Sequence, residues 1–297
     1  MSNPYLPQEI LDDITDILHN DRDALKRCCL VSKSWVPRTQ KHLSADIKFK
    51  FENYDKWKKT FPDPTNSPAH HTHILTVEGS LLSAVDDSWI QGFSYVEELI
   101  VNGFSAGSKT AALSFAPFHR LAPSLTALYL SFMHLPYIQT FDLIGSLPLL
   151  ENLGLTGDKI ITNDDDESDG PDELPNVVSP IPQPLSGALE VFLSFGTRAT
   201  LRRLLDLPGG LHFRELDLSW YGGRDLPNVA EMVVACSDTL EHLQIMCTED
   251  GGIVVSLSDQ TITHIYPKPY AQIQTHRSQL TFPKPRGSEV YGLGTVP

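Results

Sequence analysis

The chain has 297 residues, of which 41% are hydrophobic and 20% are charged, and it is therefore long enough to bury a core as one large domain or as two. Its formal net charge of -14 excludes a general affinity for nucleic acid or for anionic membranes. No apolar run approaches the roughly 18 residues of a membrane span, and the first residues lack the basic and apolar regions of a secretory signal.

The cysteines indicate a reducing compartment. They are Cys28, Cys29, Cys236 and Cys247. The first two are adjacent within a helical pattern, a spacing that suits neither a zinc site nor a disulfide framework. We therefore expect buried thiols in a protein of the cytosol or the nucleus.

The first 50 residues predict three short helices. Apolar residues recur at helical spacing from Pro7, which a first helical turn tolerates, as far as Leu18. Asp21 can cap a second helix, and a third segment runs from Trp35 to Leu43 beyond a serine-rich turn. Three such helices expose more apolar side chain than they can cover among themselves, which is typical of a segment that packs against a partner.

The same residues resemble an F-box, in particular that of the F-box proteins abundant in mushroom-forming fungi. The resemblance covers about 45 residues and rests on a Leu-Pro pair, a Val-Ser-Lys-x-Trp run and spaced apolar positions, namely Leu6, Pro7, Glu9, Ile10, Leu11, Ile14, Leu18, Leu25, Leu30, Val31, Ser32, Lys33, Trp35, Leu43 and Ile47. It implies a three-helix motif that docks on the Skp-family adaptor of a cullin–RING ubiquitin ligase. The residues that it places at the adaptor are Leu6, Pro7, Ile10, Leu11, Ile14, Leu18, Leu25, Leu30, Val31 and Trp35. The alternative is a helical cap on the domain behind, and the positions near Asp23-Ala24 are not distinctive of the family.

A linker is expected between this F-box, residues 1–50, and a second domain, residues 73–280. The intervening residues 51–72 include the stretch FPDPTNSPAHHT, which is rich in proline and is typical of a loop. Residues 281–297 are interpreted as a C-terminal tail.

A short apolar pattern returns seven times in the second domain. Each copy reads as a strand with alternate apolar residues, and the central apolar positions are 75, 99, 128, 153, 192, 216 and 243. The spacings are 24, 29, 25, 39, 24 and 27 residues, and only the interval of 39 departs from the period of leucine-rich repeats, which is about 20–29 residues. That interval contains an acidic, proline-rich segment, about residues 163–184, which we expect to be a disordered insertion.

Helical segments are predicted between the strands, over residues 110–122, 136–147, 197–207 and 227–240. The predicted fold class is therefore α/β, with the N-terminal three-helix F-box followed by an irregular leucine-rich-repeat-like solenoid of parallel strands and crossing helices. Met133 and Asp158 stand where regular repeats have asparagine or cysteine, so the resemblance is to the irregular repeats found behind many F-boxes. An ordinary α/β domain with a parallel sheet would give the same alternation and remains the alternative.

The strand residues between the paired leucines are candidates for binding a substrate. If the leucines point to the core, their neighbours lie on the opposite face of the sheet. The later repeats offer aromatic and hydrogen-bonding groups there, and aromatic residues directly after a strand often anchor a partner. Their alternative role is to pack under the following loop. The predicted substrate-binding residues are Tyr129, Glu215, Asp217, Trp220, Tyr221, His242 and Gln244.

The sequence carries no motif for catalysis or for a cofactor. The histidines at 70, 71 and 73 lack a second cluster of metal ligands. The acidic run near Gly170 has Asn176 where a calcium loop requires a bidentate glutamate. Neither a glycine-rich phosphate loop nor a G-x-S-x-G turn is present. We therefore predict a protein that is not an enzyme and that needs no cofactor or metal.

Together these features predict a substrate-receptor subunit of an SCF-type cullin–RING ubiquitin ligase. The F-box would bind the Skp-family adaptor, and through it the cullin–RING ligase, while the repeat domain would bind an unknown protein substrate. No nucleic acid or membrane is expected as a partner. The alternatives are a leucine-rich-repeat-like interaction scaffold without a ubiquitin role and a hydrolase built on the α/β region.

Overall fold

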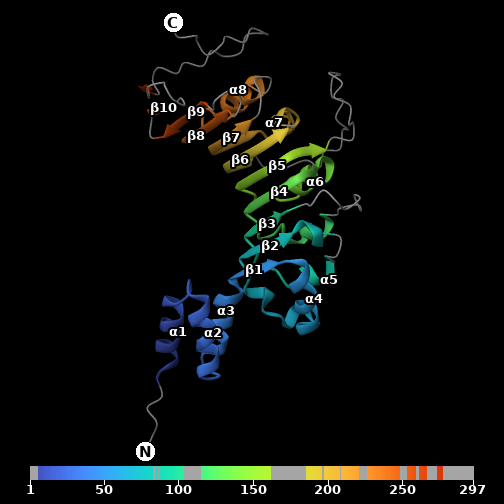
Figure 1. Ribbon diagram of the computed structural model, residues 1–297, viewed down its shortest axis with the longest axis vertical. Coiled ribbons are helices and arrows are strands. Elements are labelled where there is room, and N and C mark those ends of the chain that lie inside the picture. The colour runs from blue at the N-terminus through green and yellow to red at the C-terminus, as the bar shows by residue number, and fades with distance from the viewer. Residues whose placement is uncertain are drawn as a thin grey trace, which may run out of the picture. The chain divides into compact units, whose positions relative to one another are not determined.

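The computed structural model divides the chain into two compact units, Met1–Leu130 and Ser131–Pro297 (Figure 1). The structure describes residues 6–82, 85, 87–103, 115–161, 185–195, 197–207, 209–220, 226–247, 253–258, 261–265 and 273–276. In both units the strands are hydrogen-bonded in the order in which they occur in the chain. The predicted insertion near residues 163–184, the predicted tail of residues 281–297 and Tyr221 lie outside the described residues.

The first unit begins with three helices at the positions that apolar spacing predicts. They are α1 (Gln8–Ile17), α2 (Arg22–Val31) and α3 (Val36–Ala45). The carboxylate of Asp21 accepts a hydrogen bond of 2.9 Å from the amide of Ala24 and so caps α2. Pro37 lies in the first turn of α3, where its missing amide hydrogen costs no helical hydrogen bond.

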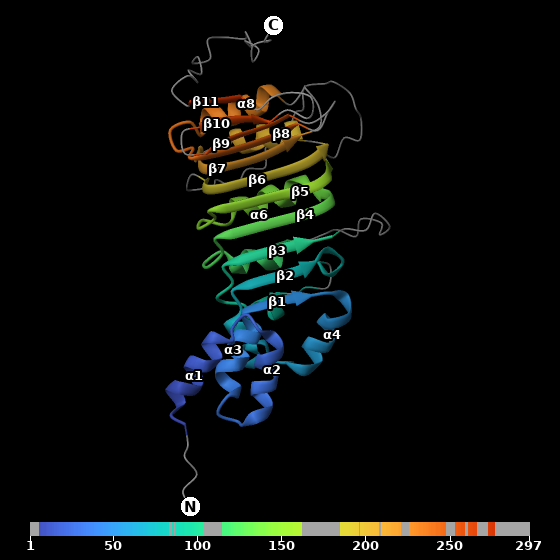
Figure 2. The ribbon, with the colours of Figure 1, turned by 60° about the vertical axis from the view of Figure 1, so that its left-hand side comes forward.

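The remainder of the first unit is a parallel sheet with helical connections (Figure 2). Strands β1 (Asp46–Phe49), β2 (Ile74–Glu78) and β3 (Glu98–Asn102) are in register, with Ile47 opposite Leu75 and Leu75 opposite Leu99. The connections contain the helices α4 (Phe51–Thr60) and α5 (Asp87–Ile90) and the short 3-10 turns η1 (Pro64–Asn66), η2 (Pro68–His71), η3 (Gly79–Leu81) and η4 (Ala116–Leu121).

The linker predicted at residues 51–72 is wrong, because this segment is helical and partly buried. The ring of Phe49 lies 5.9 Å from that of Tyr54 on α4 and 4.9 Å from that of Trp89 on α5, in edge-to-face geometry. Tyr54 and Ala69 are buried. The prolines that suggested a loop instead begin η1 and η2, which the side chains of Asp63 and Ser67 cap.

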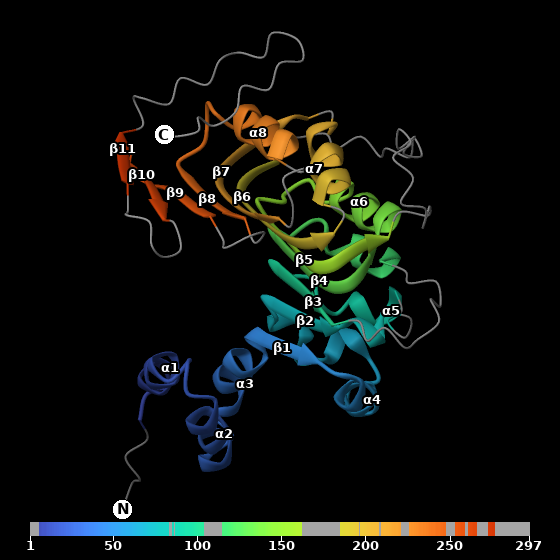
Figure 3. The ribbon, with the colours of Figure 1, turned by 45° about the horizontal axis from the view of Figure 1, so that its top comes forward.

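The second unit repeats the strand–helix alternation. Strand β4 (Ala127–Pro136) crosses the boundary between the units, and β5 (Asn152–Ile161), β6 (Leu185–Phe195), β7 (Leu211–Trp220) and β8 (His242–Cys247) follow, with β5 to β8 parallel. The helices α6 (Tyr137–Gly145), α7 (Thr197–Leu205) and α8 (Leu226–Ala235) lie on one face of this sheet (Figure 3). The predicted α/β class with parallel strands is therefore present.

The register corrects one of the predicted repeat positions. Leu153 pairs with Leu189, Leu189 with Leu216, and Leu216 with Leu243, so the centre of β6 is Leu189 and not Phe192. Leu189 is buried among the core residues, whereas Phe192 is half-buried on the other face. The prediction was off by an odd number of residues, and such a slip exchanges the two faces of a strand.

The parallel repeat ends before the predicted limit at residue 280. Strands β9 (Ile253–Ser258), β10 (Thr261–Ile265) and β11 (Ile273–His276) follow β8 in antiparallel order. Two residues separate β9 from β10, and a connection of that length permits only an antiparallel hairpin.

Candidate protein-interaction surfaces

A small core holds the three N-terminal helices together. Leu11 of α1 and Leu25 of α2 are buried, as are the hydroxyl-bearing Thr15 and Thr39. The hydroxyl of Thr15 donates to the carbonyl of Asp12 at 2.8 Å, which satisfies it inside the helix. Leu11 and Leu25 were predicted to bind an adaptor, but their side chains serve this core.

Asp16 joins α1 to α3. Its carboxylate accepts hydrogen bonds from Arg38 Nε at 2.7 Å and Nη2 at 2.5 Å, and it lies 2.7 Å from His42 Nε2. The guanidinium and the imidazole both favour the ionised carboxylate, so they hold the pKa of Asp16 well below its usual range.

Further hydrogen bonds connect the ends of the helices. Gln8 Nε2 on α1 donates to the carbonyl of Ser34 at 3.2 Å, which places the start of α1 beside the turn that follows α2. Arg22 of α2 donates to the carbonyls of Leu43 at 3.1 Å and Asp46 at 3.2 Å. Its positive charge thereby meets the free carbonyls at the end of α3, where a helix dipole favours a cation.

Large apolar side chains gather on the outside of α1 and α2. The exposed fractions are 58% for Leu6, 44% for Ile10, 79% for Ile17, 87% for Leu30 and 68% for Val31. We call these five residues the N-terminal apolar surface. Among the residues whose side chains the structure describes, the other large apolar residues that are exposed are Phe51, Tyr95 and Leu149. The bond from Gln8 to Ser34 brings the Leu6–Ile10 end of α1 to the Leu30–Val31 end of α2, so the exposed residues at these ends lie in one region.

The predicted adaptor residues thus divide into three groups. Leu6, Pro7, Ile10, Leu30 and Val31 are exposed, Ile14, Leu18 and Trp35 are half-buried, and Leu11 and Leu25 are buried. Ile17 is exposed but was left out of the predicted site. Its spacing of seven residues from Ile10, two turns along the same side of α1, is the signal that could have included it.

A second candidate surface is the face of the second unit's sheet that is opposite to α6, α7 and α8. The central leucines of β5 to β8 are buried and most of their neighbours along each strand are less buried, so the leucines belong to the face that packs on the helices. On the other face the register places Glu190 opposite Asp217 and Asp217 opposite Gln244, with Glu215 opposite His242 in the neighbouring row. Four of the predicted substrate residues, Glu215, Asp217, His242 and Gln244, are therefore brought together.

The other predicted substrate residues do not join this group. Tyr129 is half-buried in the part of β4 that belongs to the first unit. Trp220 ends β7, but its side chain, like Tyr221, lies outside what the structure describes. Glu190 and Phe192 are on the surface and were not predicted, because the register of β6 was misassigned.

The carboxyl group of Asp217 is in an unfavourable environment. Burial and the negative charge of Glu190 on the adjacent strand both raise the pKa of Asp217. Its Oδ1 atom is buried and has no hydrogen-bond partner among the described residues. An ionised carboxyl group at this position lowers the stability of the free protein. Ionisable residues in such unfavourable environments are common at functional sites.

The known protein families give no further guidance. Neither a family model nor a curated protein matches the chain. The two surfaces are therefore the features of the chain that bear on its function.

The described residues contain neither a helix that could cross a membrane nor a group of metal ligands. None of their helices is both long enough and apolar enough to cross a membrane. No group of three or more histidine, cysteine or acidic side chains within those residues could hold a metal ion. A pocket of about 320 Å³ lies between β1, α4 and the end of α3, but several polar groups lining it already pair with one another. Arg22 binds carbonyls, Asn53 binds the carbonyl of Lys48, and Asp46 forms an ion pair with Lys48.

Proposed function

We propose that the chain is the substrate-receptor subunit of an SCF-type cullin–RING ubiquitin ligase. Helices α1 to α3 act as an F-box that binds a Skp-family adaptor, and the strand–helix repeats, as an irregular leucine-rich-repeat-like domain, bind a protein substrate. The single observation that carries the proposal is the N-terminal apolar surface: four large apolar side chains on α1 and α2, and Leu6 just before α1, are exposed, while other residues fill the core of these helices. Such a concentration is typical of a protein–protein interface.

The proposed mechanism is positional. The receptor holds a lysine of its substrate near the ubiquitin-conjugating enzyme, which raises the effective concentration of that lysine. No side chain of the receptor need take part in bond making or breaking. Asp16 and its partners keep α1 on α3, so the exposed residues of α1 and α2 present one surface to the adaptor.

The experiment is co-purification with a recombinant Skp-family adaptor. Ile10→Asp and Leu30→Asp each place a carboxylate where the adaptor would bury an apolar side chain, and burying an unpaired charge costs several kcal/mol. We expect each variant to lose at least about 100-fold in affinity for the adaptor. Both positions are exposed in the free protein, so the variants should melt at the temperature of the wild type.

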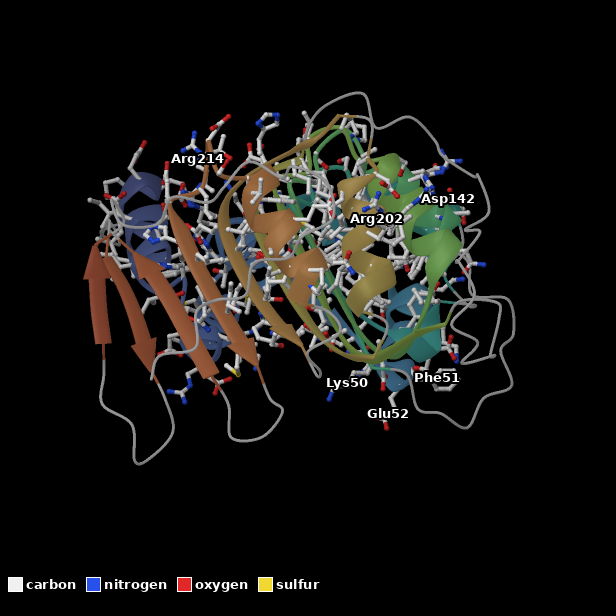
Figure 4. The ribbon with its side chains drawn as sticks, turned by 90° about the horizontal axis from the view of Figure 1, so that it is seen from above. Lys50, Phe51, Glu52, Asp142, Arg202 and Arg214 are labelled. Atoms are coloured by element: carbon white, nitrogen blue, oxygen red, sulfur yellow. The ribbon has the colours of Figure 1, made fainter. Side chains whose placement is uncertain are left out.

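Phe51→Asp is the matched control. Phe51 is 62% exposed on α4, in the same unit but outside the N-terminal apolar surface (Figure 4). We expect this variant to bind the adaptor as the wild type does. Undiminished adaptor binding by Ile10→Asp and Leu30→Asp would contradict the proposal. Failure of the wild type to bind any Skp-family adaptor would instead favour a repeat scaffold without a ubiquitin role.

A further inference from the structure

The helix-free face of β6 to β8 carries a cluster of acidic groups. Glu190, Glu215 and Asp217 all project from alternate positions on this face, and the register sets Glu190 directly opposite Asp217. Neighbouring strands are about 4.8 Å apart, so the two carboxyl groups lie close together. The exposed Arg214, which the register shift leaves without an opposite residue, precedes Glu215 on β7. Twelve of the paired positions on this face from β5 to β8 hold no lysine or arginine: Asn152, Gly154, Thr156, Ala188, Glu190, Phe192, Glu215, Asp217, Ser219, His242, Gln244 and Met246.

Apolar groups stand directly beside these acids. The row next to Glu190 and Asp217 reads Phe192, Ser219 and Met246 across β6, β7 and β8. Phe192 and Met246 are half-buried, and Ser219 between them is only 6% exposed. The face therefore combines a pair of carboxylates with an adjacent row in which a small residue lies between two apolar ones.

The free protein does not satisfy this pair. Like charges on directly opposed strand positions repel each other. The Oδ1 atom of Asp217 is buried and accepts no hydrogen bond from the described residues. A buried acceptor without a donor is costly, and a donor supplied by a partner would remove that cost.

The geometry points to a docking site for a basic segment of a partner protein on the helix-free face of β6 to β8, with a lysine or arginine head group between Glu190 and Asp217. The aliphatic stem of that side chain would lie over Ser219 between Phe192 and Met246. A guanidinium suits two adjacent carboxylates best, because its planar fork can donate to both. If the receptor function proposed above holds, the basic segment belongs to the substrate to be ubiquitylated. Only this identification of the partner rests on the proposed function.

The test measures binding of defined peptides to the full chain. The probes are fluorescein-labelled dodecapeptides of alternating arginine and serine, of alternating lysine and serine, and of alternating glutamate and serine. Fluorescence anisotropy is recorded at about 0.15 M salt, where attraction between distant exposed charges is largely screened. We expect the two basic peptides to bind the wild type, the arginine peptide more tightly, and the glutamate peptide not to bind.

The decisive variant replaces both acids, Glu190→Gln with Asp217→Asn. We expect its affinity for the basic peptides to fall by about tenfold or more. The matched control is Asp142→Asn with Asp238→Asn, which changes the net charge equally. Asp142 is on α6, on the side of the sheet that carries the helices, and Asp238 follows α8 (Figure 4). This control should bind within about twofold of the wild type.

Stability provides a second readout. Asp217→Asn removes a like-charge contact, so the double variant should melt at or above the temperature of the wild type although it binds less well. Equal loss of binding in both double variants would reduce the effect to net charge and overturn the proposal. The proposal would also be overturned if the wild type bound neither basic peptide. A clear fall in the melting temperature of the Glu190→Gln, Asp217→Asn variant would overturn it too, because the two acids would then have a structural role. The receptor function is judged separately, because adaptor co-purification of the same variants does not involve this face.

Discussion

Asp16 shows how one residue can organise a surface without belonging to it. In the sequence it resembles its neighbours Asp12 and Asp13, which suggest a solvated side of α1. In the structure it receives Arg38 and His42 from α3. Ile17 is the next residue along the chain and is exposed, so the ion pair sets the direction in which this part of the apolar surface faces.

The lowered pKa of Asp16 predicts a pH-dependent contribution to stability. Because the pKa is lower in the folded than in the unfolded protein, the contribution is complete above the unfolded value, about 3.9, and is lost as the pH falls through the folded value. We expect Asp16→Asn to lower the melting temperature at pH 7 and the difference from the wild type to shrink below about pH 4. Thermal unfolding at a series of pH values measures this.

Asp13→Asn is the control for that experiment. Asp13 is exposed on the same helix, and the structure gives its side chain no hydrogen bond. Its replacement should leave the melting temperature nearly unchanged at every pH. An equal effect of the two replacements would mean that general charge, and not the contact with Arg38 and His42, stabilises the helices.

The sequence predicts which residues of α1 and α2 are apolar but not which of them are left exposed. Leu11 and Ile10 are adjacent and chemically alike, yet one is 7% and the other 44% exposed. The apolar stripe is wide enough to serve both α3 and a partner, and only the packing of α1 on α3 divides it between them. The same limit explains why Ile17 was missed.

Strand β6 is the element on which the second unit's register depends. A shift of register occurs between Gly187 and Ala188, and Gly187 has a φ of +83°. A Cβ atom at Gly187 would lie 2.3 Å from the carbonyl oxygen of Glu151. That oxygen accepts a hydrogen bond of 3.1 Å from the amide of Ala188, so it cannot move away without loss. Glycine is required here for both its backbone conformation and its lack of a side chain.

We expect Gly187→Ala to lower the free energy of unfolding by about 2 kcal/mol or more, because the strain of a positive φ adds to the steric overlap. Gly210→Ala isolates the strain of the positive φ. Gly210 has a φ of +72°, but a Cβ atom there would have its nearest neighbour, a side-chain atom, 3.9 Å away. Its cost should be about 1 kcal/mol. Urea unfolding measures both, and equal losses would show that the close approach to Glu151 is unimportant.

At the scale of elements, the strands and helices with strong periodicity were predictable. The helices at α6, α7 and α8 and the strands at Leu75, Leu99, Leu153, Leu216 and Leu243 lie where the apolar pattern places them. The centre of β6 was not, because Leu189, Val191 and Leu193 on one face and Phe192 on the other are all apolar, so the apolar pattern alone does not decide between the two faces. Helix α4 was hidden by its polar composition, since its burial depends on Tyr54 and Trp57 meeting the distant ring of Phe49.

At the scale of the whole chain, the first strand belongs to the sheet and not to the helices before it. Residues 46–49 pair with β2 along their whole length. The other edge of β1 is protected by side chains: Arg22 donates to the carbonyl of Asp46, and Asn53 donates to that of Lys48 at 2.8 Å. These bonds occupy groups that an exposed edge would offer to other chains.

A truncation at the predicted boundary after residue 50 should therefore damage the sheet. We expect a chain that begins at Phe51 to melt at a lower temperature than one that begins at Asp46, and to aggregate more, because it exposes the edge of β2. Calorimetry and light scattering compare the two. If they are indistinguishable, β1 contributes nothing to the sheet, and removing residues 1–50 would be a clean test of adaptor binding.

The spacing of the paired leucines also identifies a place where the chain can accept inserted residues. Leu189, Leu216 and Leu243 are 27 residues apart, while Leu153 and Leu189 are 36 apart, yet the last two pair in the same register as the others. The nine additional residues, 36 − 27, are thus absorbed without a shift of β6. An epitope tag or a protease recognition sequence inserted between β5 and β6 should be carried in the same way, so this interval is suited to labelling the protein in cells while both proposed binding surfaces remain intact.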